Sequence, residues 1–372
     1  MLRTCFDRLT VILAAAFCFT VVANAQSGRV QPTPTPEKED PVKVITEEVK
    51  LNVIAFDEDG KFVPDVTEKD LVITENNVLH QATSVRRLPA NVLIVMDTGG
   101  ELRWVKNLDQ TRKVARGVVN ALKPGDSIAL LQYSDKAEIV AEWTTEKADV
   151  LSAIGKTKFG KRSAFVEALG LATDFLSKNP IENKHLVLIT DGTDSFGNRT
   201  AKTQAMRDLL GTDISVHVIS YSHMEATDIT PRTKMISNTP PPKAMPDEVV
   251  AQLPNGVRQA RQAPKIGPTI NLDRKLLKTL KARKADLEIS EEQLAELAKN
   301  TNGEMIIPVT PEEMVEKSAL VAKMIDSSYV VTYTPKLALN ESTAERDIIV
   351  TSKRPGLVVD ARRKLILNSE RP

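Results

Sequence analysis

Residues 92–97 read VLIVMD and residues 185–191 read HLVLITD, two mostly apolar runs that each end in an aspartate. Between residues 91 and 220, further apolar runs alternate with stretches of helical spacing. Apolar strands that alternate with helices are typical of a parallel sheet covered on both faces. We therefore predict an α/β fold with a Rossmann-like, mostly parallel sheet flanked by helices.

Period-two alternation appears on both sides of this α/β region. Residues 42–90 hold three strand patterns, and residues 328–368 hold three more. Each flank is too small to form a stable sheet comfortably by itself. We predict that the flanks pair, so that a small β domain formed by N- and C-terminal strands brackets an α/β domain over residues 91–327.

Several helix starts can be predicted from capping signals. Apolar spacing predicts a first helix over residues 102–122. Thr145 and Ser163 are expected to cap the next two helices. Ser290 and Gln293 form a capping box, which predicts that a late helix begins there.

Residues 223–285 interrupt the α/β pattern with eight prolines and with twelve basic against five acidic residues. Residues 272–287, which begin within this insertion, have the spacing of a basic helix. Two interpretations stay open, an interaction arm for an acidic partner or surface and a solvated, poorly ordered loop. The loop is favoured, because the positive charges are spread among prolines.

The first 25 residues have the features of a secretory signal peptide. Arg3 and Arg8 precede an apolar run that is shorter than the roughly 20 residues of a membrane span, and Ala23-Asn24-Ala25 fits a cleavage site. An uncleaved anchor is the alternative. We expect an exported protein, periplasmic or extracellular, without a stable membrane span after cleavage and with a proline-rich linker at residues 26–41.

Composition excludes several function classes. The 372 residues carry a net charge of +1, and 4% are aromatic, so neither electrostatic attraction to nucleic acid nor a base-stacking surface is expected. Cys5 and Cys18 both lie in the signal segment. The mature chain is therefore expected to be cysteine-free, without disulfides or thiolate metal ligands.

Candidate ligand-binding residues lie where ligands bind in open α/β sheets, beyond the carboxyl ends of the strands. Asp97 and Asp191 each follow a predicted strand, and Ser163 precedes the helix between them. Carboxylate and hydroxyl oxygens that converge suit a hard cation. The alternative is that the aspartates only cap helices and fix loops.

The order of several segments resembles the von Willebrand factor A domain family. These are the strand ending in Asp97, Pro124-Gly125-Asp126, Ser163-Ala164-Phe165, Leu188-Ile189-Thr190-Asp191-Gly192 and the stretch LAELAKNTNGE at residues 294–304. With the export signal and the flanking strands, the chain is most similar to exported bacterial proteins that carry such a domain. The resemblance implies the von Willebrand A-type version of the predicted fold.

The family often uses a metal-ion-dependent adhesion site with the pattern Asp-x-Ser-x-Ser, a threonine and an aspartate. Asp97 and Asp191 match the first and last positions, and Ser163 replaces the threonine. Gly99 and Glu101 stand where the serines are expected. The resemblance therefore implies a degenerate site made of Asp97, Glu101, Ser163 and Asp191, with Mg²⁺, Mn²⁺ or Ca²⁺ as its cofactor or with none.

Together with the export signal, the resemblance implies an exported, non-enzymatic protein-binding or adhesion module. Its partner would be a protein, with an acidic side chain as the candidate recognition group, and not a nucleic acid. The alternatives are a metal-dependent hydrolase that uses the same carboxylates and a metal-free structural protein of the cell envelope. We find no compelling nucleophile or general base for the hydrolase.

Overall fold

The computed structural model describes residues 48–100, 106–178, 180–237, 269–270, 273–336 and 345–366. The chain divides into two units, Met1–Thr46 and Glu47–Pro372, and every described residue belongs to the second. The predicted signal peptide and linker lie outside the described residues.

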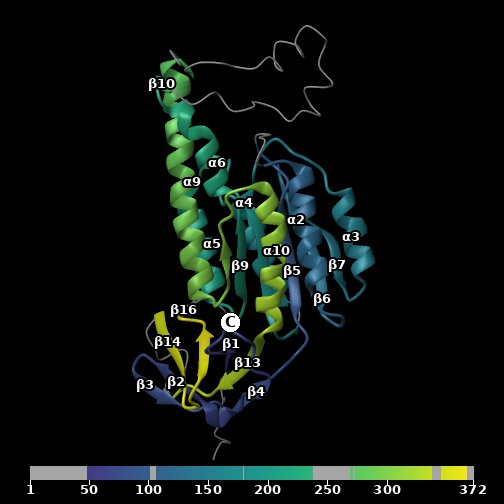
Figure 1. The fold of residues 1–372 in the computed structure, drawn as a ribbon, viewed down its shortest axis with the longest axis vertical. Helices are drawn as coiled ribbons and strands as arrows, with labels where there is room; N and C mark the ends of the chain where they lie inside the picture. The colour runs from purple at the N-terminus through teal and green to yellow at the C-terminus, as the bar shows by residue number, and fades with distance from the viewer. Residues whose placement is uncertain are drawn as a thin grey trace, which may run out of the picture. The chain divides into compact units, whose positions relative to one another are not determined.

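A six-stranded sheet forms the centre of the α/β region, with the order β12-β9-β8-β5-β6-β7 (Figure 1). All neighbours are parallel except β6 and β7, which form an antiparallel pair. The predicted mostly parallel sheet is therefore confirmed. The strands are β5 (Asn91–Asp97), β6 (Ser127–Tyr133), β7 (Ala137–Thr144), β8 (Lys184–Thr190), β9 (Ser215–Ser220) and β12 (Met305–Ile306).

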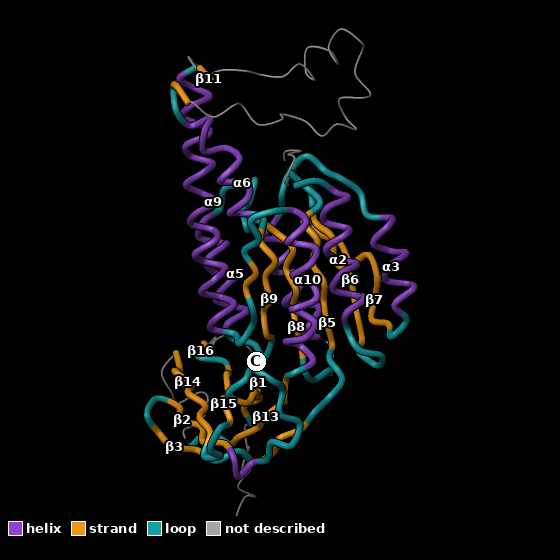
Figure 2. The backbone as a smooth tube through the Cα atoms, in the orientation of Figure 1, coloured by secondary structure: helices purple, strands orange, loops and turns teal. Residues whose placement is uncertain are grey.

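Helices cover both faces of this sheet (Figure 2). Alternate side chains of β5 divide between two cores: Val92 and Ile94 pack with α2, α3 and α10, whereas Leu93 and Val95 pack with α4, α5 and α9. The helices are α2 (Leu108–Ala121), α3 (Lys147–Lys156), α4 (Phe165–Lys178), α5 (Arg199–Leu210), α6 (Ser222–Ile229), α9 (Arg274–Asn300) and α10 (Pro311–Asp326), with short 3₁₀ turns η1 (Glu68–Asp70) and η2 (Thr230–Thr233). None of the helices in the described ranges is long and apolar enough to cross a membrane.

Three predicted helix starts are wrong. Helix α2 begins at Leu108, where Asn107 is the N-cap, and α3 begins after Glu146 without a side-chain cap, so Thr145 does not cap it. At the start of α4, Asp194 Oδ1 accepts the Val166 N–H, whereas the Ser163 hydroxyl points elsewhere.

Helix α9 corrects a further prediction, because it runs without a break through the capping box at Ser290. Ser290 is buried, and its hydroxyl accepts a hydrogen bond from Lys202 Nζ at 2.9 Å. Leu287 and Leu294 continue one buried stripe on either side of it. Tertiary packing therefore overrides the local signal, and the two predicted helices are one.

The flanking strands pair as predicted, in two four-stranded sheets of order β15-β1-β13-β4 and β16-β14-β2-β3. Each sheet mixes strands from both ends of the chain around one core, to which Leu51, Ile73, Val331 and Ile348 contribute. The strands are β1 (Val49–Asp57), β2 (Leu71–Glu75), β3 (Val78–His80), β4 (Ser84–Arg86), β13 (Ser328–Tyr333), β14 (Glu345–Ser352), β15 (Leu357–Ala361) and β16 (Lys364–Ile366). A further two-residue pair joins β10 (Ile236–Ser237) and β11 (Thr269–Ile270).

Candidate functional site

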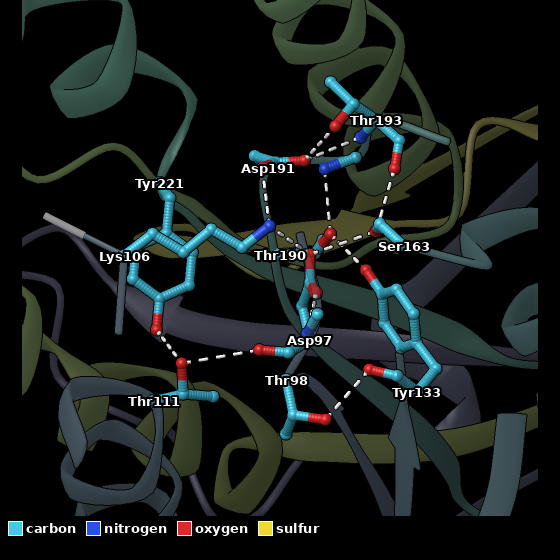
Figure 3. Close-up of polar contacts among 12 residues, drawn as sticks. Asp97, Thr98, Lys106, Thr111, Tyr133, Ser163, Thr190, Asp191, Thr193 and Tyr221 are labelled. Atoms are coloured by element: carbon cyan, nitrogen blue, oxygen red, sulfur yellow. Dashed lines mark hydrogen bonds and ion pairs between the residues drawn. The ribbon is translucent and has the colours of Figure 1, made fainter. Parts of the chain in front are cut away.

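The candidate site lies at the carboxyl ends of β5 and β8, which are adjacent parallel strands. Asp97 ends β5 and Asp191 follows β8, so the two side chains meet at this edge (Figure 3). Ser163 Oγ lies 3.5 Å from Asp97 Oδ2 and donates to the Thr193 carbonyl oxygen at 3.1 Å. The structure thus brings together Asp97, Ser163 and Asp191, all of them buried, while Glu101 lies outside the described residues.

A lysine that the sequence analysis did not single out lies between the two aspartates. Lys106 Nζ is 2.7 Å from Asp97 Oδ2 and 2.7 Å from Asp191 Oδ2, and its side chain is 6% exposed. Lys106 directly precedes Asn107, the N-cap of α2. A positive charge beside a helix N-terminus opposes the helix dipole, and the two carboxylates offset this unfavourable position.

Arg283 brings a second cation to the site from α9. Its guanidinium donates to Asp191 Oδ2 at 3.0 Å, to Thr193 Oγ1 at 2.6 Å and to Glu225 of α6 at 2.9 Å. Arg283 and Glu225 both belong to the insertion at residues 223–285. The interpretation of the insertion as a solvated loop is therefore wrong for its two described ends, which pack at the site.

Every carboxylate oxygen of the two aspartates accepts a hydrogen bond from the protein itself. Asp97 Oδ1 accepts the Gly99 N–H at 3.1 Å, and Asp191 Oδ1 accepts the N–H and hydroxyl of Thr193 at 2.8 and 2.6 Å. The two Oδ2 atoms accept from Lys106. The aspartates therefore form a closed, internally satisfied cluster.

Buried hydroxyl groups hold the strand ends in place around this cluster (Figure 3). The Tyr133 and Thr190 hydroxyls are 2.6 Å apart, and those of Tyr221 and Thr111 are 2.7 Å apart. Thr111 Oγ1 also donates to the Asp97 carbonyl oxygen at 3.4 Å. Strands β6 and β8 are thus linked across β5, and the end of β9 is linked to α2.

The two aspartates differ in their electrostatics. Burial raises the pKa of the Asp97 carboxyl despite the nearby Lys106 ammonium. Burial also opposes ionisation of Asp191, yet Lys106 and Arg283 hold the pKa of its carboxyl well below the ordinary value. Burial by itself would lower the pKa of Lys106. The two carboxylates outweigh burial and hold the pKa of Lys106 well above that of a free lysine. Lys106 and Asp191 therefore remain charged.

Residues 92–193 match the family model of the von Willebrand factor type A domain. This part of the chain is similar to von Willebrand factor type A domains. The predicted family is thereby confirmed for the strands and loops that carry Asp97, Ser163 and Asp191. No curated protein matches the chain.

Solved structures that match part of the backbone include the following three proteins. An aerotolerance-related membrane protein from Bacteroides fragilis NCTC 9343 is 16% identical, with 64% of this chain and 98% of that chain covered at a TM-score of 0.40. A von Willebrand factor type A protein from Catenulispora acidiphila is 11% identical, with 83% and 76% covered at a TM-score of 0.42. The conserved hypothetical protein BatB from Bacteroides thetaiotaomicron is 16% identical, with 63% and 98% covered at a TM-score of 0.37.

The residues at this edge of the sheet do not fit a divalent cation in the arrangement observed. Lys106 Nζ occupies the point between the carboxylates. At Gly99 a Cβ atom would lie 1.8 Å from the Arg162 carbonyl oxygen, so a serine cannot stand there without movement of the loop. Within the described ranges, no group of three or more histidine, cysteine, aspartate or glutamate side chains is placed to hold a metal ion.

A cavity of about 490 Å³ adjoins the cluster. Four basic side chains line it, and none of its described lining residues is acidic. The lining residues are Gly100, Lys106, Lys161, Ser163, Thr193, Ser195, Arg232, Leu276, Thr279, Leu280 and Arg283. The cavity therefore presents ammonium, guanidinium and hydroxyl donors, which suit an anionic group.

Proposed function

We propose that this chain is an exported, non-enzymatic protein-binding module of the von Willebrand A type. Its ligand surface is the carboxyl edge of the six-stranded sheet, around Asp97, Glu101, Ser163 and Asp191. The observation that carries the proposal is the cavity of about 490 Å³ at this edge, with four basic and no acidic described lining residues. Such a lining suits an acidic side chain of a protein partner.

Two further considerations support the proposal. Asp97, Asp191 and Glu225 all accept hydrogen bonds from Lys106 or Arg283, so none of these carboxylates is free to serve as a general base or nucleophile. The features of the first 25 residues support export. The metal role of the four predicted residues stays a prediction, and recognition through the basic cavity does not require it.

The test uses the full chain on an array of peptide pairs that differ only in Asp versus Asn or Glu versus Gln. Acidic peptides are expected to bind at least about tenfold more tightly, because one charge-assisted pair contributes about 1.5 kcal/mol or more. Lys161→Glu should abolish the preference, since Lys161 lines the cavity.

Lys178→Glu is the matched control, because Lys178 is an exposed lysine at the end of α4, away from the residues that line the cavity. Equal binding of both members of each pair, or equal loss in the two variants, would contradict the proposal. Turnover of simple esters or phosphoesters that is lost in Asp97→Asn would favour the hydrolase instead.

A further inference from the structure

We propose that Lys106 is a built-in cation, which stands between Asp97 and Asp191 in place of a divalent metal ion and makes the site complete without one. Two carboxylates at the ends of adjacent parallel strands point to a common position. Oxygens arranged in this way are what a hard cation requires. The group at that position is the Lys106 ammonium.

The distances are those of charge-assisted hydrogen bonds. Nζ is 2.7 Å from one oxygen of each aspartate. Mg²⁺ would need oxygens at about 2.1 Å and Ca²⁺ at about 2.4 Å, so neither ion can share this space with the ammonium. Metal binding to the wild-type chain therefore requires that Lys106 leave its buried position.

Ion pairing stabilises Lys106 in its buried position. A lysine at 6% exposure is destabilising unless it is paired, and here it directly precedes the N-cap of α2, where the helix dipole adds to that cost. The two carboxylates offset both effects. The same pairing relieves their mutual repulsion, so lysine and aspartates stabilise one another.

The loop after Asp97 supports the same inference independently. Gly99 offers no side-chain oxygen, and its position leaves no room for one, because the Arg162 carbonyl oxygen lies 1.8 Å from where a Cβ would be. The Gly99 N–H instead donates to Asp97 Oδ1. At Gly99 the loop therefore contributes an N–H donor to the Asp97 carboxylate and no side-chain oxygen for a cation.

One consequence rests on the proposed function, whereas the built-in cation itself does not. Lys106 has three N–H groups, and two of them bind the aspartates. Because Lys106 also lines the cavity of about 490 Å³, we expect an acidic group of a partner there to accept a hydrogen bond from its ammonium. Recognition would then be direct and insensitive to chelators.

The experiment measures thermal unfolding of the full chain in EDTA and in MnCl₂, together with Mn²⁺ binding by electron paramagnetic resonance. Wild type should neither bind Mn²⁺ at this site nor change its Tm. Lys106→Ala should have a lower Tm in EDTA, and Mn²⁺ at 100 times its Kd should raise that Tm by about 5 °C. The rise should vanish in Lys106→Ala/Asp97→Asn.

Lys106→Met is the matched control, because it removes the charge but keeps a side chain that fills the space. It should be destabilised and should gain nothing from Mn²⁺. If Lys106→Ala is unfolded in EDTA, Mn²⁺ should restore its fold. The proposal is overturned if Mn²⁺ raises the Tm of wild type but not of Asp97→Asn, or if Lys106→Ala gains no stability from Mn²⁺. Neither result depends on a protein ligand, so failure here is distinct from failure of the proposed function.

Discussion

At the scale of single residues, His185 and His217 form a buried chain of hydrogen bonds in neighbouring strands. The Glu304 N–H donates to His217 Nδ1 at 3.1 Å, so the proton of a neutral His217 is on Nε2. Nε2 then donates to His185 Nδ1 at 3.1 Å, and His185 Nε2 donates to Asn183 Oδ1 at 2.9 Å. One backbone donor thus fixes both tautomers, and a proton added to either ring would place two donors against each other.

The hydrogen bonds of His185 and His217 predict that the fold loses stability in acid. Burial lowers the pKa of His217 from 6.5 to about 4, and burial together with His217 lowers that of His185. Because each folded-state pKa lies below the unfolded value, stability is fully present above about pH 6.5 and is lost as the pH falls toward 4. His217 alone should account for about 3 kcal/mol of that loss.

Urea unfolding at pH 7.5, 5.5 and 4.5 measures the effect. His217→Gln should be less stable than wild type at pH 7.5 but should lose much less stability on acidification. His223→Gln, at an exposed position of α6, should keep the wild-type pH dependence. Parallel pH curves for wild type and His217→Gln would contradict the assignment.

The residues of the site were only partly predictable. Asp97, Ser163 and Asp191 could be placed because each adjoins the end of a recognisable strand or the start of a helix, and topology brings such ends together. Lys106 could not, because nothing local states which carboxylates a lysine will meet after the chain has folded. Lys106 neutralises Asp191 only after folding has brought the end of β8 beside it, and β8 begins almost 80 residues later in the chain.

At the scale of elements, α9 connects the insertion to the site. It is continuous over Arg274–Asn300, and its second half packs on the sheet through Leu294 and Leu297. Its first half carries Arg283 to Asp191 and Glu225. The central strands β5, β8 and β9 were predictable because they are mostly apolar. The length of α9 was not predictable, since the sequence alone does not show that Ser290 is buried.

Arg283→Met should therefore destabilise the fold by about 2 kcal/mol, because two buried carboxylates lose a shared partner. This expected destabilisation is smaller than for a fully buried ion pair, since the Arg283 side chain is 28% exposed. Arg199→Met, which removes an exposed pair with Asp286, should cost less than about 1 kcal/mol. Urea unfolding of both variants makes the comparison, and equal losses would show that Arg283 is not part of the buried cluster.

At the scale of the whole described unit, both ends of the chain build the same β sheets. Strand β1 lies between β13 and β15, and β2 lies between β14 and β3. The pairing of the two flanks was predictable, because neither has enough strands alone. Strands β3 and β16 were missed, since each has three residues and follows a longer strand after only two residues.

A buried ion pair joins these two ends. Arg346 of β14 pairs with Glu75 of β2, which lies 271 positions earlier, and His80 Nε2 lies 3.4 Å from the other Glu75 oxygen. Removing one partner of such a pair leaves an uncompensated buried charge, which costs about 3–5 kcal/mol, whereas replacing both with apolar or neutral groups costs much less. The pair therefore ties the two flanks together energetically as well as spatially.

Arg346→Met is expected to destabilise the protein by about 3 kcal/mol, and the double variant Glu75→Gln/Arg346→Met to recover at least half of that loss. Urea unfolding of wild type, both single variants and the double variant gives the coupling energy. Limited proteolysis adds a second measure: because each sheet contains strands from both ends of the chain, cleavage in residues 48–88 and in residues 345–366 should rise together in Arg346→Met. Increased cleavage in one flank with the other still protected would mean that the ends fold independently, and the single β unit would have to be abandoned.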